Sequence, residues 1–520
     1  MPYDFGTWDR NCNAEQSQPL TGTLTGTIPS WLRGSLVCNG PGLMKYGDHE
    51  FKHVFDGSAM LQKFTISETG MTYTSKFIKS FAYTTNTEHQ QIVVSEFGTR
   101  GCSVTKGFLS KLGSKFQFDK MFSDNPPVTL ARFGGAYYAT TEAPFLHRID
   151  LDTLETGEKV NLHKLLNLNS QCPHPVTLAD GATVNVHSAV GPLGPRYEVV
   201  KFPPTCPAGA DSVFAKPVKL ASCETRWKLN PCHMHTFGLT EHYALLPEQP
   251  LTVDVTAMVA NTIKDKPLIE GMEWLKDKQV KYRILSLETG KELKLKVKSE
   301  SFFYMHIANC YEEADHLVFD VTTFETPSLL HQFKLENLRT KGSALAGEVD
   351  SGCIRRYVVP LNESVKAAPE ENLVKLPGAQ ATAHRQKDGT IFLTSQKLSD
   401  VAYENPVVNP AMERKPYNFF YGISGDMTSN KASVGKVNVR TAEVTRWDAP
   451  DDVYAASIAF APRPGATAED DGVLLVHCVH AERRRVSLWL LSAADLSDIA
   501  SASFTLATDA PRALHAVYMP

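Results

Sequence analysis

A short unit recurs along almost the whole chain: an alternating strand, a polar turn and a returning strand. Each copy indicates a β-hairpin, because alternating apolar residues flank a turn cluster of the kind seen at residues 288–290. Hairpins repeated over several hundred residues predict the blades of a β-propeller. An ordinary antiparallel sandwich is the alternative that this pattern leaves open. The clearest copies are residues 147–156, 283–297, 436–447 and 487–504.

Length and charge narrow the class further. A chain of 520 residues often holds several domains, but all-β propellers run long as one unit, so we predict a single domain over residues 1–520. The net charge of −4, with acids and bases interspersed, gives no basic surface for nucleic acid. The first ten residues contain no apolar run typical of a signal peptide, and no stretch approaches a membrane-spanning length. These features predict a cytoplasmic protein.

The cysteines and the common catalytic motifs exclude several site classes. The ten cysteines are scattered without a CxxC pair, which argues against a thiolate zinc site and predicts reduced thiols. GxSxG, HExxH and Walker sequences are absent, and no GxGxxG follows a strand. Histidine, with 17 copies, is the remaining candidate for chemistry.

Four histidines interrupt apolar or strand-like stretches: His174, His235, His306 and His515. The first three are about one blade apart, and the fourth would return on the closing blade, so all four could converge on a propeller axis. Four imidazoles would form a neutral, nitrogen-rich site suited to Fe, Cu or Zn. Carboxylates behind the rings would then be needed to fix each tautomer and balance the charge. Ordinary structural roles for these histidines remain open, and His233 competes with His235 as the ligand of its pair.

Two segments depart from the strand pattern and predict short helices. Residues 252–276 carry apolar positions near helical spacing, and so do residues 106–120, with lysines between them. A basic amphipathic segment can rest on a membrane surface, or it can pack on the protein body. The apolar patch predicted in the second segment consists of Phe108, Leu109, Leu112 and Phe116.

Several separate motifs resemble the carotenoid cleavage oxygenase family. They are LRGSLVCNGPG at residues 32–42, HVFDG at 53–57, SEFGT at 95–99, HTFGLT at 235–240, RRYVVPL at 355–361, KPY at 415–417 and EDDG at 469–472. Their order and their span, nearly end to end, make the resemblance specific. The chain is similar to the animal branch, which includes β-carotene oxygenases, insect isomerooxygenases and the vertebrate retinoid isomerase.

This resemblance implies an all-β fold, a seven-bladed β-propeller with a small helical cap over a substrate tunnel. It implies one Fe(II) bound by His174, His235, His306 and His515. Three glutamates of the family orient three of these rings, and two of them match Glu142 and Glu404. The third, which in the family faces the C-terminal histidine ligand, here His515, is replaced by Ser457, in YAASIAF at residues 454–460, and this departs from the family pattern.

The implied activity is O₂-dependent cleavage of a carotenoid double bond to give aldehydes. Candidate residues of the tunnel wall are Phe97, Thr141 and Phe303, with core packing as the other interpretation of each. The vertebrate Pro-Asp-Pro-Cys-Lys motif is replaced by residues 100–106, which favours the oxygenase over the isomerase, with reversible membrane-surface association. The sequence indicates no obligate protein partner. Retinoid isomerohydrolase and a catalytically silent carotenoid-binding propeller remain the alternative functions.

Overall fold

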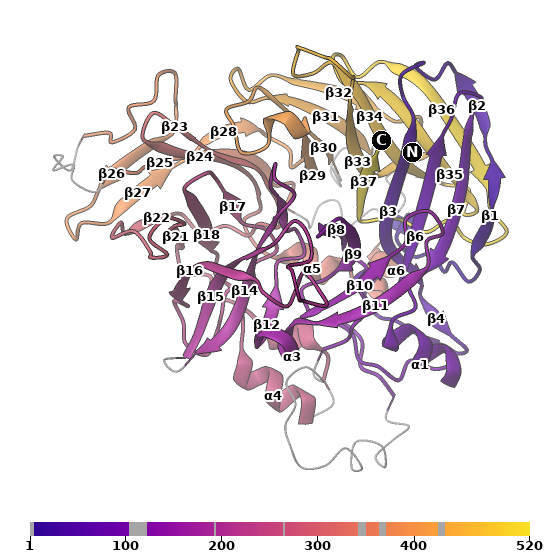
Figure 1. Cartoon of the computed structure of the whole chain (residues 1–520), viewed down its shortest axis with the longest axis horizontal. Helices are drawn as coiled ribbons and strands as arrows, with labels where there is room; N and C mark the ends of the chain where they lie inside the picture. The colour runs from indigo at the N-terminus through magenta and orange to yellow at the C-terminus, as the bar shows by residue number, and fades with distance from the viewer. Residues whose placement is uncertain are drawn as a thin grey trace.

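Strands from the two ends of the chain complete one sheet: β3 (Gly34–Leu43) pairs with β37 (His515–Met519), antiparallel, with Asn39 opposite His515. Figure 1 labels these two paired strands next to each other. The computed structural model describes residues 5–102, 122–191, 194–263, 266–341, 350–362, 371–424 and 432–520. Over these ranges it is mostly antiparallel β-sheet, as the hairpin pattern predicts.

Seven sheets of four or more strands make up the described part of the chain, and they form the blades of a propeller. The first sheet adds β1 (Gln16–Thr21), β6 (Ser58–Ile66) and β7 (Met71–Phe77) to β3 and β37. The second runs through β8 (Thr129–Phe133), β9 (Ala136–Thr140), β10 (Phe145–Ile149) and β11 (Thr156–Asn161). The third contains β12 (Leu168–Gln171), β13 (Val176–Thr177), β14 (Thr183–Gly191), β15 (Gly194–Phe202) and β16 (Val218–Glu224).

The fourth sheet is the widest of the described sheets because a later hairpin joins it through a parallel pairing. It contains β17 (Gly238–Leu239), β18 (Tyr243–Glu248), β21 (Val280–Ser286), β22 (Val297–Ser299), β27 (Ile391–Thr394) and β26 (Thr382–Arg385). The fifth contains β23 (Ile307–Glu313), β24 (His316–Thr323), β25 (Cys353–Pro360) and β28 (Gln396–Ser399).

The last two sheets bring the chain back to its start. The sixth contains β29 (Glu404–Val408), β30 (Phe419–Ser424), β31 (Ser433–Asn438) and β32 (Val444–Asp448). The seventh contains β33 (Val453–Pro462), β34 (Gly472–His480), β35 (Arg485–Ser492), β36 (Asp498–Thr505) and the early strand β2 (Thr23–Gly26). Because β2 joins the last sheet and β3 pairs with β37, the ring is closed by backbone hydrogen bonds on two neighbouring blades.

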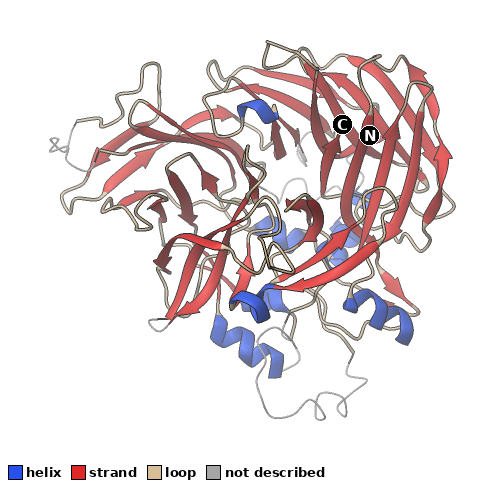
Figure 2. Ribbon diagram, in the orientation of Figure 1, coloured by secondary structure: helices blue, strands red, loops and turns tan. Residues whose placement is uncertain are grey.

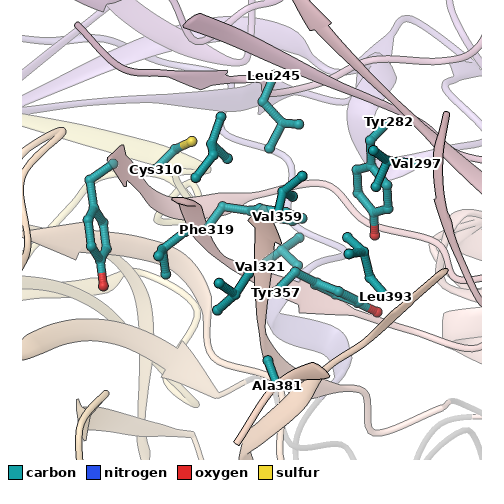
Figure 3. Packing of buried hydrophobic residues seen from close by; sticks show 14 of the residues in the cluster. Leu245, Tyr282, Val297, Cys310, Phe319, Val321, Tyr357, Val359, Ala381 and Leu393 are labelled. Carbon is teal, nitrogen blue, oxygen red and sulfur yellow. The ribbon is translucent and has the colours of Figure 1, made fainter. Parts of the chain in front are cut away.

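The four sequence hairpins lie where they were predicted. The pairs β10–β11, β31–β32 and β35–β36 cover three of them, and β21 with its return through Glu292 to β22 covers the fourth. Turns between them use residues that tolerate a positive φ, such as Gly290 at 69°. The hydrophobic core lies between neighbouring blades. Figure 3 shows its largest cluster, where Tyr282 and Val297 of the fourth sheet pack against Phe319 and Tyr357 of the fifth.

The α-helices lie in the lower part of the view in Figure 2, whereas the 3₁₀ turn Pro410–Met412 lies near the top. Their ends carry ordinary caps: the Ser80 side chain accepts from the Tyr83 amide at the start of α1 (Phe81–His89), and Asn161 caps α3 (Leu162–Leu166) in the same way. The others are α4 (Val255–Ile263), α5 (Ser328–Gln332) and α6 (Leu335–Lys341). The helix predicted within residues 252–276 is therefore present but shorter, followed by a 3₁₀ turn (Leu268–Gly271) and β20 (Met272–Trp274), which pairs with β19 (Leu251–Val253).

The ten cysteines are all unpaired, as their scattered positions predict. In the described ranges, none of the helices has the length and apolarity needed to cross a bilayer.

Candidate metal centre

Four histidines meet where inner strands of different blades begin. His515 is the first residue of β37, and His306 directly precedes β23. His235 lies three residues before β17, and His174 lies in the link between β12 and β13. Because these strands approach the propeller axis from different sides, their first residues converge although they are far apart in sequence.

The ring geometry is close enough for one ion. The candidate ligand atoms of His174, His235, His306 and His515 all lie within 4.8 Å of one another. The Nε2 atoms of His174 and His235 are 3.1 Å apart. Ring centroids of His174 and His515 are separated by 4.3 Å, and those of His306 and His515 by 5.0 Å. Four imidazoles at this spacing offer the all-nitrogen donor set that the sequence predicts.

Two of the four rings are held by carboxylates. The Nδ1 atom of His235 lies 2.7 Å from Glu142 Oε1, and His306 Nδ1 hydrogen-bonds Glu404 Oε2. A ring that donates from Nδ1 to a carboxylate keeps the Nε2 lone pair for a metal. The Nε2 atom of His306 is buried and has no hydrogen-bond partner among the described residues. An orphaned imidazole nitrogen beside three others fits a bound metal ion.

The electrostatics of the cluster favour the neutral form of three rings, His174, His306 and His515. Burial, together with the neighbouring histidines, holds the pKa of His174 and of His515 well below the usual value. Burial also lowers the pKa of His306, against the opposing effect of Glu404. Although burial alone would raise the pKa of Glu142, the hydrogen bond and charge of His235 and the nearby His233 bring it to about 2. Neutral imidazoles and an ionised carboxylate at Glu142 are the protonation states that metal binding requires.

Ser457 does not take the place of a third carboxylate. It is fully buried on β33, and its hydroxyl donates to the Cys38 thiol at 3.5 Å. The ring of His515 has no hydrogen-bond partner among the residues that the structure describes. The cluster is therefore asymmetric, with carboxylates behind His235 and His306 and none behind His515.

His233 lies outside the four-histidine group. Its ring is nearly parallel to that of His235, with centroids 6.3 Å apart, and its Nε2 is 3.9 Å from Glu142 Oε1. The segment that carries both histidines is irregular, not the strand that the HxH spacing suggests. His233 thus shares the carboxylate of its neighbour without joining the cluster.

An apolar cavity of about 470 Å³ lies beside the cluster. His235, His306 and His515 form part of its wall, as do Glu142 and Glu404. The rest is largely apolar and includes residues of the short helices, among them Val255 and Met258 of α4 and Leu329 and Leu330 of α5. A second cavity, of about 700 Å³, is lined by His174, His306 and His515 together with residues of the inner strands. The cluster therefore separates two cavities.

The three residues predicted to line a tunnel differ in position. Phe97 and Thr141 line the apolar cavity, and the Thr141 hydroxyl also donates to Glu142 at 3.2 Å. Phe303 is not among the lining residues. It is fully buried, and its backbone bonds to Phe324, which does form part of the wall. Phe303 is thus a core residue behind the wall, held by an isolated bridge to Phe324 and packed in a buried cluster with Leu251 and Leu330.

Two polar residues near the cluster escaped the sequence analysis. The Thr236 hydroxyl donates to the Met305 carbonyl and accepts from the Ile307 amide, so it fixes the backbone on both sides of His306. The Asn405 amide donates to the Leu514 carbonyl at 2.7 Å and so anchors the residue before His515. Their only signal was adjacency to His235 and Glu404 in sequence. The predicted membrane patch, Phe108, Leu109, Leu112 and Phe116, lies outside the described residues.

Comparison with known proteins decides the family. The model of the family described as "RPE65: Retinal pigment epithelial membrane protein" matches residues 9–520. The chain belongs to this family. It is 34% identical over 525 residues to a carotenoid isomerooxygenase of Galleria mellonella, covering 99% of this chain and 97% of that protein. It is 32% identical to β,β-carotene 15,15'-dioxygenase of Rattus norvegicus over 514 residues, which is 97% of this chain and 90% of that one.

Solved structures support the fold of this RPE65-family chain. Cobalt-substituted Synechocystis ACO superimposes with a TM-score of 0.75 at 20% identity, covering 99% of this chain and 98% of that one. A chimera of ACO and RPE65 gives a TM-score of 0.77 at 21% identity, covering 100% and 99%. The seven-bladed propeller implied by the sequence resemblance is confirmed by the sheets of this structure and by these neighbours.

Proposed function

We propose that this protein is a non-haem Fe(II) dioxygenase that cleaves a double bond of a carotenoid and releases aldehydes. The observation that carries the proposal is the four-histidine cluster, with carboxylates on two of its rings, in the wall of an apolar cavity. The names of the relatives, which include carotenoid dioxygenases and isomerooxygenases, support the same reaction class.

Each group of residues would have a separate task. His174, His235, His306 and His515 would hold the iron through nitrogen atoms. Bound Fe(II) would supply activation of O₂, so that the two carbons of one double bond each become a carbonyl. Glu142 and Glu404 would retain the Nδ1 protons of two rings and so keep their Nε2 atoms directed at the metal. No general base is needed, which agrees with the missing nucleophile motifs.

The cavity would position the polyene and exclude water. Its wall offers aromatic and aliphatic surfaces, including Phe97, Met258 and Met305, that suit an elongated hydrocarbon. Burial in such a cavity draws its free energy from removal of apolar surface from water, at about 25 cal/mol per Å². The same cavity would limit access of water to the reacting carbons.

Product analysis tests the proposal directly. Iron-loaded protein incubated with β-carotene and O₂ should yield aldehydes, identified by chromatography and mass spectrometry. Single replacement of His174, His235, His306 or His515 by Ala should remove bound iron and turnover, whereas His233→Ala should retain most of both. Release of retinol from retinyl ester without aldehydes would instead assign an isomerohydrolase. Carotenoid binding without iron or O₂ uptake would assign a silent binding protein.

We also propose that the protein associates reversibly with membrane surfaces. The support is the sequence pattern of Phe108, Leu109, Leu112 and Phe116, with lysines between them. A lipid surface would be the store from which an apolar substrate is drawn.

A further inference from the structure

Three buried carboxyl groups lie close together near the apolar cavity: Asp56, Glu96 and Asp124. Two of them have their hydrogen-bond needs met within the fold. Asp56 accepts from the Gly98 amide at 2.8 Å and from the Thr99 hydroxyl. A buried carboxyl group with such partners is adequately explained as part of the structure.

Asp124 is held even more completely. It accepts from the Phe81 and Ala82 amides at 3.0 and 2.9 Å, at the start of α1, and from Lys159 at 2.7 Å. Although burial opposes them, the neighbouring His147 and the Lys159 cation keep the pKa of Asp124 well below its usual value. This carboxylate thus caps a helix and pairs with a cation.

Glu96 is different because only one of its oxygens is used. Oε1 accepts from the Ser123 hydroxyl at 2.6 Å, whereas Oε2 has no hydrogen-bond partner among the described residues. Glu96 is 6% exposed. Its Oε2 atom is not one of the fully buried side-chain atoms that lack a hydrogen-bond partner, so this atom keeps some accessible surface. Glu96 is also one of the residues that line the apolar cavity.

The surroundings of Glu96 are aromatic. Its neighbour Phe97 lies 6.5 Å from Phe55, centroid to centroid, and Phe55 lies 5.5 Å from Phe333, all in the same cavity wall. Burial, together with the charges of Asp56 and Asp124, raises the pKa of Glu96 well above its usual value, which favours the protonated acid, a form that donates a hydrogen bond. An unpaired donor in an apolar wall is costly unless a ligand accepts its hydrogen bond.

We propose that Glu96 binds an oxygen atom at one end of the substrate, which makes oxygenated polyenes the preferred substrate class. The oxygen would be a hydroxyl or a carbonyl, since either accepts a hydrogen bond from a carboxylic acid. This inference rests on the proposed function and assigns to the same cavity a group that distinguishes end groups. A hydrocarbon end would leave Oε2 unpaired, and the site would therefore discriminate against it.

The test compares substrates in the iron-loaded full-length protein. β-Carotene is the hydrocarbon probe, zeaxanthin is the same polyene with ring hydroxyls, and an apocarotenal presents a chain-end carbonyl. Wild type should show a higher kcat/KM for at least one oxygenated probe than for β-carotene. In Glu96→Leu this preference should fall by about 3- to 10-fold, as expected for one hydrogen bond. Glu96→Gln, which can still donate, should keep most of the preference.

The outcomes separate this inference from the proposed function. Loss of the preference for zeaxanthin alone assigns the oxygen to a ring hydroxyl, and loss for the apocarotenal alone assigns it to a carbonyl. An equal fall on all three probes in Glu96→Leu, or no change on any, would overturn the inference even while β-carotene is cleaved. Melting temperature and iron content of the variants identify a merely structural effect, which would lower all three rates together. Absence of cleavage in wild type would reject the proposed function. The inference is tested separately by fluorescence quenching, and it would be rejected if each of the three probes bound to Glu96→Leu as tightly as to wild type.

Discussion

The Nδ1 atom of His306 hydrogen-bonds Glu404 across two neighbouring blades: His306 stands directly before β23, and Glu404 is the first residue of β29. If His306 binds a metal, this carboxylate fixes the ring and strengthens its donor nitrogen. We expect Glu404→Gln to lower iron affinity by about 10- to 100-fold with the fold intact. Iron content after dialysis against a chromogenic chelator measures the effect. Glu142→Gln, which alters the partner of His235, is the matched comparison, and unchanged retention in both variants would contradict a role in metal binding.

At Ser457 a carboxylate can be added behind a ring instead of being removed. The His515 ring has no carboxylate behind it, and the Ser457 hydroxyl is directed to Cys38 instead. Replacing Ser457 by Glu should supply the missing acceptor and slow the loss of iron to a chelator. Ser457→Gln, of equal size but without charge, is the control for steric effects in this fully buried position. Iron loss from Ser457→Glu that is as fast as in wild type, in a variant with normal melting temperature, would refute the idea.

His477 should make stability depend on pH. It is fully buried, opposite Ser457 in the sheet register, and neither ring nitrogen has a hydrogen-bond partner in the described structure. Burial lowers its pKa to about 3. Between pH 6.5 and that value the unfolded chain takes up a proton that the folded chain refuses, so stability falls as the pH falls, by about 1.4 kcal/mol per pH unit.

His477→Leu should remove this contribution. Its unfolding free energy or melting temperature should decline less steeply from pH 6.5 to 4.5 than in wild type, whereas replacement of the exposed His89 by Leu should leave the slope unchanged. A slope in His477→Leu identical to that of wild type would show that the ring is already protonated in the folded protein.

Arg356 and Asp320 form a buried ion pair between adjacent strands of the fifth sheet. The Arg356 guanidinium donates to both oxygens of Asp320, at 2.8 and 2.7 Å, and the Tyr417 hydroxyl donates to the same carboxylate at 2.6 Å from the sixth sheet's side. We expect Asp320→Ala to lower the free energy of unfolding by about 3–5 kcal/mol, because it leaves a buried cation uncompensated. Tyr417→Phe should lower it by only about 1 kcal/mol. Denaturant unfolding checks both values, and similar losses would contradict this ranking.

Membrane association can be tested by flotation with liposomes. Each fully inserted side chain of the patch would contribute about 1.5–3 kcal/mol, partly offset by desolvation of Lys106 and Lys111. The double variant Phe108→Ser and Leu112→Ser should float much less than wild type, whereas replacement of the exposed Leu229 by Ser should not matter. Equal flotation of wild type and the double variant rejects the patch.

The hairpins could be predicted from the sequence for physical reasons, whereas the pattern alone made the four histidines candidates and family resemblance supplied their joint role. Alternation of apolar residues sets which face of a strand is buried, and this pattern is local. The number of blades came from family resemblance, because alternation does not say how many sheets close a ring. The pairing of β3 with β37 is also invisible in local pattern, since partner strands far apart in sequence leave no periodic signal.

The surroundings of the side chains in the site were harder to predict from the sequence than the positions of the strands. Phe303 and Phe97 are both aromatic residues near matched motifs, yet only Phe97 reaches the cavity. Neither residue lies in a regular strand, so the conformation of an irregular segment decides between cavity wall and core, and no periodic pattern in the sequence reveals it. The sequence distinguishes Glu96 only as part of the motif at residues 95–99, because an acid in a short loop normally faces water. Its burial beside Asp56 and Asp124 exists only in the folded chain.

The closure between β3 and β37 sets the order of events during biosynthesis. His515 is the residue of β37 that pairs with Asn39, so its imidazole takes its place only when the last strand docks on the first blade. In a nascent chain whose last strand has not yet docked, only three of the four histidines would be in place, and the edge of β3 would be unpaired. We therefore infer that iron binds after ring closure, and that the bound ion then stabilises the pairing of β37 with β3. A chain that fails to close would stay metal-free, and its exposed strand edges would mark it for removal by proteases.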